Sequence, residues 1–77
     1  MNGTRGLKRL AMDEALAKLI GLAMDRRDVP ADARPATVER LRQHADYQTI
    51  IEHYLLGASD RALTGLIERA IFGIAAG

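Results

Sequence analysis

The segment at residues 63–74 constrains the fold of this chain more than any other stretch. Its apolar residues recur at intervals of three and four positions, as Leu63, Leu66, Ile67, Ala70, Ile71 and Ile74. This spacing places them on one side of an α-helix. Because a helix with one apolar side must bury that side against other elements, the segment predicts a helix that belongs to a packed core.

The rest of the sequence also favours helices over strands. A second set of apolar residues has helical spacing near the start of the chain: Met12, Ala15, Leu16, Leu19, Ile20 and Ala23. Thirteen alanines stand against only two valines, a balance typical of helical structure. We therefore predict a single all-α domain, a small antiparallel bundle of three to four helices. The predicted helices lie at about residues 5–26, 33–44, 47–56 and 60–75.

Prolines, glycines and capping residues set the expected helix boundaries. Pro30 and Pro35 bracket a predicted linker at residues 28–35, because the residue before a proline is disfavoured in helical conformation. The apolar pattern changes phase near residues 44–46, which predicts either two helices or one bent helix. Gly57 is expected to end this region in a left-handed conformation. The expected N-terminal caps are Thr4, Asp32, Asp46 and either Ser59 or Asp60.

The apolar side of each predicted helix defines an expected core. Its members come from every predicted helix, so all the helices must pack together to bury these residues. The expected core residues are Leu16, Leu19, Ile20, Ala23, Leu41, Ile50, Ile51, Tyr54, Leu55, Leu63, Leu66, Ile67, Ala70, Ile71 and Ile74.

Residue types and their spacing argue against an enzyme or a metal protein. The chain has no cysteine, which excludes disulfides and thiolate metal sites. His44 and His53 are separated by about 13 Å of helical rise, too far for one helix to bring both to one ion. The paired carboxylates lie next to Lys or Arg, as on ordinary solvated helix faces. We predict no catalytic residue, no cofactor and no metal.

The charge pattern gives no sign of a strongly basic surface or of a membrane segment. Eleven basic residues nearly balance ten acidic ones, and the net charge is +1. No apolar run reaches the ~20 residues of a transmembrane helix, and no signal peptide is recognisable. An amphipathic membrane-surface helix fits poorly, because the first predicted helix mixes acidic with basic residues. We expect a cytoplasmic protein.

Phe72, the only phenylalanine, falls outside the apolar side of the last predicted helix. At about 100° per residue it lies about 180° from Leu63, among small residues and one arginine. Small residues allow another chain to approach closely, and aromatic residues and arginine are enriched in interfaces. The alternative is that Phe72 packs on the first helix of the same chain. The predicted protein interface consists of Ala62, Gly65, Arg69, Phe72, Gly73 and Ala76.

Together these features predict a small non-enzymatic protein-binding module, acting as a regulator, inhibitor or accessory subunit and self-associating as a homo-oligomer. The main alternative is a helix-turn-helix type DNA-binding transcriptional regulator. Its second helix would contain Asp46 and Glu52 but no Lys or Arg, and these acids oppose phosphate binding. The residues expected to contact nucleic acid in that alternative are Arg5, Lys8, Arg9, Arg40, Arg42, Gln48 and Thr49.

Overall fold

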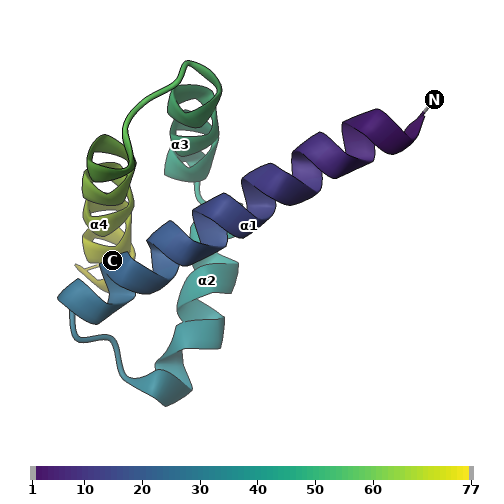
Figure 1. Ribbon diagram of the computed structural model, residues 1–77. Helices are drawn as coiled ribbons and strands as arrows, with labels where there is room; N and C mark the ends of the chain where they lie inside the picture. Colours follow the sequence, from purple (N-terminus) through teal and green to yellow (C-terminus); the bar gives the residue numbers. More distant parts are fainter. Residues whose placement is uncertain (1, 77) are drawn as a thin grey trace.

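The prediction of an all-α bundle is confirmed (Figure 1). The computed structural model describes the backbone of residues 2–76 and the side chains of residues 11–74. Its elements are α1 (Asn2–Arg26), the 3₁₀ turn η1 (Ala31–Ala33), α2 (Arg34–Gln43), α3 (Ala45–Leu55) and α4 (Asp60–Ala76). No helix in this range is both long enough and apolar enough to cross a membrane.

Helix α4 organises the fold, because it packs against each of the other three helices. Its main neighbour is α1, which runs across the other helices, with its first turns extending beyond them (Figure 1). Leu63 and Ile67 of α4 are completely buried, as are Leu16 of α1 and Leu41 of α2. The apolar stripe that the sequence predicts on the last helix is therefore the centre of the core.

Helices α2 and α3 are separate helices joined by a single residue, His44. Its backbone is extended (φ −81°, ψ 145°), so the helical hydrogen-bond ladder stops there. The His44 side chain caps α3, since its Nδ1 accepts a hydrogen bond from the backbone N–H of Asp46 at 3.1 Å. Of the two alternatives that the sequence left open, two separate helices are present, and the predicted cap Asp46 is wrong.

The turn after α3 is formed at Gly57. Gly57 has a φ of +86°, which glycine adopts without a steric penalty. The N–H groups of Gly57 and Ala58 donate to the carbonyls of Tyr54 and His53, both at 3.0 Å, which is the pattern of a Schellman motif. Gly57 therefore ends α3 as the sequence predicts.

Two other predicted caps are wrong. Thr4 lies inside α1, which begins at Asn2. Asp32 lies in η1, and the residue before α2 is Ala33, which makes no side-chain cap hydrogen bond. Ser59 is confirmed as a cap of α4, since its hydroxyl oxygen accepts the Ala62 N–H at 3.2 Å.

The core agrees with the sequence pattern apart from a few positions. Leu55 is 71% exposed, so its predicted burial is wrong. At about 100° per residue it lies beyond the sector of α3 that Ile50, Tyr54 and Ile51 occupy. Met24 is buried although it is absent from the predicted set. The remaining predicted residues are either buried or packed against the core from its edge.

Candidate protein-binding surface

One side of α4 faces away from the core and carries polar, small and aromatic residues in a row. Arg61, Gly65, Arg69 and Phe72 follow one another at intervals of four, four and three residues, so they share one side of the helix. We call these four residues the α4 face. Arg61, Arg69 and Phe72 are exposed and Gly65 is half-buried. The α4 face therefore offers both charge and apolar surface to a partner.

Most of the interface residues predicted from the sequence lie on or beside the α4 face. Ala62 and Gly73 are exposed on the same helix. The side chain of Ala76 lies outside the described residues. The sequence did not single out Arg61, although its spacing of four residues from Gly65 is a usable signal.

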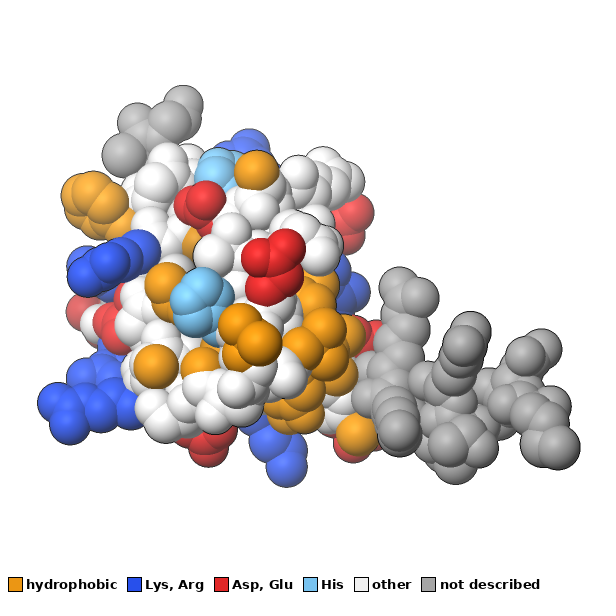
Figure 2. Space-filling model, turned by 90° about the horizontal axis from the view of Figure 1, so that it is seen from above, with side chains coloured by type: hydrophobic (Ala, Val, Ile, Leu, Met, Phe, Trp, Pro, Cys, Tyr) orange, Lys and Arg blue, Asp and Glu red, His pale blue; other side chains and the backbone are white. Residues whose placement is uncertain are grey.

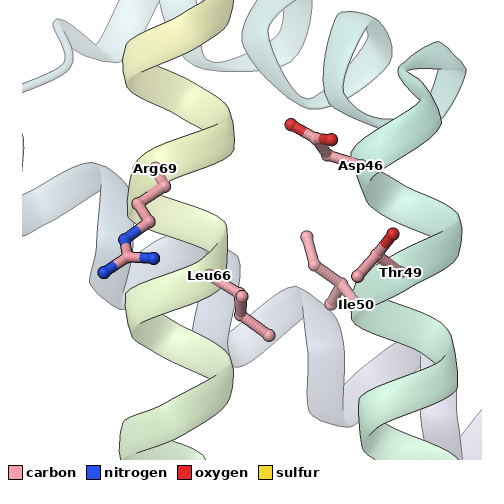
Figure 3. A pocket seen from close by; sticks show the side chains of 5 residues that line it. All are labelled: Asp46, Thr49, Ile50, Leu66 and Arg69. Atoms are coloured by element: carbon pink, nitrogen blue, oxygen red, sulfur yellow. The ribbon is translucent and has the colours of Figure 1, made fainter.

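A groove between α3 and α4 adjoins the α4 face. Its first part is a hollow of about 150 Å³ lined by Asp46, Thr49, Ile50, Leu66 and Arg69 (Figure 3). Figure 3 shows Ile50 and Leu66 between the two helices, with Asp46 directed toward α4 and Arg69 directed away from α3. The floor of this part is apolar, and its two charged side chains, Asp46 and Arg69, do not point toward each other.

The second part of the groove is an open hollow of about 320 Å³. It shares Leu66 and Arg69 with the first part, so the two hollows adjoin each other. The lining residues are His53, Arg61, Ala62, Gly65, Leu66 and Arg69. A Cβ atom added to Gly65 would meet nothing within 4 Å, so no side chain of the bundle occupies that space. The α4 face and the groove thus form one connected surface.

The positive charges on this surface are not neutralised within the described part of the chain. Neither Arg61 nor Arg69 takes part in an ion pair there. His53 uses its Nδ1 in a contact of 2.8 Å with the backbone carbonyl of Thr49 on its own helix. Asp46 is the only acidic residue among those that line the two hollows. A negatively charged partner would therefore meet two available guanidinium groups.

Phe72 is not covered by the first helix. The guanidinium of Arg27 lies over its ring, with Cζ 5.7 Å from the ring centroid, but the residue remains 62% exposed. Arg27 also holds Glu68, since its Nε lies 3.6 Å from a Glu68 carboxylate oxygen, and Arg26 approaches the other oxygen at 3.9 Å. The alternative that α1 buries Phe72 is therefore wrong: Arg27, the residue that follows α1, makes a cation–π contact with the ring, and most of the side chain stays exposed.

Three further large apolar side chains are exposed, and the sequence did not assign them to a surface. Leu55 is 71%, Leu56 86% and Leu22 54% exposed. Leu55 and Leu56 lie where α3 turns into α4. Figure 2, which looks onto that end of the molecule, shows hydrophobic side chains gathered there among single charged ones. A usable signal was the pair of leucines directly before Gly57, because Ile51 and Tyr54 already fill the inward side of α3.

A third hollow, of about 350 Å³, lies on another side of α4, beneath the linker between α1 and α2. Val29, Pro30, Ile71 and Ile74 give it an apolar lining, and Arg40 stands among the residues around it. Ile71 and Ile74 belong to the core side of α4, so this hollow is separate from the α4 face. It shows no cluster of groups that would perform chemistry.

The residues predicted for DNA binding are dispersed. Arg40 and Arg42 are exposed on α2, and Gln48 and Thr49 are exposed on α3. Thr49 faces the groove. The side chains of Arg5, Lys8 and Arg9 lie outside the described residues. Only His44 joins α2 to α3, whereas a helix-turn-helix motif has a turn of about three to four residues.

Within the residues that the structure describes, no three His, Asp or Glu side chains come together as a metal site. No protein-family model matches the chain, and no curated protein or solved structure is significantly similar to it.

Proposed function

We propose that this chain is a cytoplasmic, non-enzymatic protein-binding module, and that it acts as a regulator, inhibitor or accessory subunit. The observation that carries the proposal is the exposure of Phe72, its only phenylalanine, three residues after Arg69, which lines the groove. Aromatic residues and arginine dominate the energetics of protein interfaces, and both are present on the α4 face.

The exposed apolar side chains are a source of binding free energy. Burying one large apolar side chain stabilises a complex by about 1.5–3 kcal/mol. Phe72, Leu22, Leu55 and Leu56 all lie open to solvent in the isolated chain. These four residues add nothing to the small core of a domain of this size, so their burial is a gain that only a complex can realise.

Self-association is a separate prediction within this proposal. It is tested by light scattering behind a sizing column at tens of micromolar protein. A dimer that dissociates in the variant Phe72→Asp, but persists in the control Ala36→Asp, supports an interface at the α4 face. A strict monomer removes self-association. A dimer unaffected by Phe72→Asp places the interface elsewhere.

DNA binding receives less support from the surface. Helix α3 carries no Lys or Arg, and its exposed residues include Asp46 and Glu52. These acids would lie where a recognition helix meets phosphates, and repulsion there weakens binding at any sequence. The direct test is a titration with duplex DNA over a salt series. Tight binding that weakens steeply with salt would favour this alternative over the proposal.

A further inference from the structure

The α4 face combines two unneutralised positive charges with one exposed aromatic ring. Arg61 and Arg69 flank Gly65 at equal spacing, and Phe72 follows on the same side of the helix. Glu68, the acidic residue nearest to this row in the helix, is engaged by Arg26 at the end of α1 and by Arg27 in the turn that follows. The available charge of the α4 face is therefore positive throughout.

We propose that the α4 face binds an acidic, partly apolar segment of another protein. This inference rests on the proposed function of protein binding and specifies the chemistry of the partner. Carboxylates of the segment pair with Arg61 and Arg69, and an apolar side chain packs on Phe72. The groove beside Leu66 receives the neighbouring apolar residues of the segment.

The spacing of the α4 face sets the spacing expected in the partner. Arg61 and Arg69 are separated by about 12 Å of helical rise, and Phe72 lies about 4–5 Å further along the helix axis. Two carboxylates about two helical turns apart, followed by an apolar residue, would match these three positions. Gly65 lies between the arginines and has no side chain, so the partner backbone can approach α4 closely there.

A second copy of this chain is a poor occupant of the same surface. Arg61 and Arg69 are placed symmetrically about Gly65. A two-fold axis that passes beside Gly65 would set arginine against arginine, whether the two copies of α4 ran parallel or antiparallel. Juxtaposed like charges cost several kcal/mol in an interface. An acidic segment instead supplies the opposite charge at both positions.

A nucleic acid is also a poor occupant. The groove wall opposite α4 carries Asp46, and Ile50 and Leu66 form an apolar floor. A phosphate backbone would be repelled by the carboxylate and would gain little from the floor. A peptide with both acidic and apolar side chains can keep its carboxylates away from Asp46 and pack its apolar side chains on the floor.

The test is a selection of short helical peptides displayed as a random library against the immobilised full-length chain. We expect the enriched peptides to contain Asp or Glu at two positions about two turns apart, together with an apolar residue. The double variant Arg61→Gln/Arg69→Gln should weaken binding of these peptides about tenfold or more, because hydrogen bonds to charged groups are lost. The matched control Arg40→Gln/Arg42→Gln removes two exposed charges from α2 and should leave the affinity unchanged.

The possible outcomes separate this inference from the proposed function. Enriched peptides without an excess of acidic residues, or acidic peptides whose affinity survives Arg61→Gln/Arg69→Gln, would overturn the inference while protein binding stands. Failure to enrich any peptide would count against both. Thermal unfolding of each variant shows whether a loss of binding comes from loss of fold. If duplex DNA displaces the selected peptides from the chain, the surface is assigned to nucleic acid instead.

Discussion

Replacing Gly65 with alanine should make the domain more stable and its α4 face less able to bind. Glycine in the middle of a helix is unfavourable, because it loses more backbone freedom on folding than alanine does. No part of the bundle requires a glycine at this position, since an added Cβ would meet no atom within 4 Å. Gly65 lies on the α4 face, so the space that its missing side chain leaves is open to a partner.

The magnitude follows from helix propensity alone. Gly65→Ala should raise the free energy of unfolding by about 0.5–1 kcal/mol, with no steric cost to subtract. For a domain of this size, each kcal/mol corresponds to about 4–8 °C in Tm. Binding of the acidic peptides should weaken, because a methyl group would occupy the space through which the partner backbone approaches.

The assay is thermal and urea unfolding followed by far-UV circular dichroism, together with peptide affinity measured on the same samples. Gly21→Ala in α1 is the matched control, because a Cβ there also meets nothing within 4 Å. It should give a similar gain in stability without a change in affinity. A lower Tm for Gly65→Ala would refute the stability argument. An equal loss of affinity in both variants would refute the assignment of Gly65 to the binding surface.

Further substitutions test the packing and the turns. Leu41→Ala should lower the free energy of unfolding by about 2–5 kcal/mol, because the side chain is completely buried. Leu55→Ala should change the free energy of unfolding by about 0.5 kcal/mol or less, because this side chain is exposed. Urea unfolding compares the two variants. Gly57→Ala should destabilise by about 1–2 kcal/mol, because its φ of +86° is unfavourable for alanine, and an unchanged midpoint would contradict that turn conformation. Ser59→Ala should cost about 1 kcal/mol through loss of the bond to the Ala62 N–H, while Ser59→Asp, which keeps an acceptor, should recover most of it in the same assay.

The candidate surface was partly predictable. Phe72 and its small neighbours could be placed away from the apolar stripe of α4 by counting residues around one helix. The part supplied by α3 could not, because Thr49 and His53 reach the groove through the angle at which α3 packs on α4. The exposure of Phe72 could not be predicted either, since it depends on whether α1 passes over this side chain.

The sequence by itself determined the helical segments, a change of phase near residue 44, the turn at Gly57 and the side of each helix that is buried. These are local properties, set by the period of apolar residues and by the backbone preferences of a few residues. Only the tertiary structure decided that α1 leaves Phe72 open, that Leu55 faces solvent, and that Arg61 and Arg69 border a groove shared with α3. Each of these depends on how helices cross one another, and crossing angles arise from the contact of two surfaces that no single segment contains.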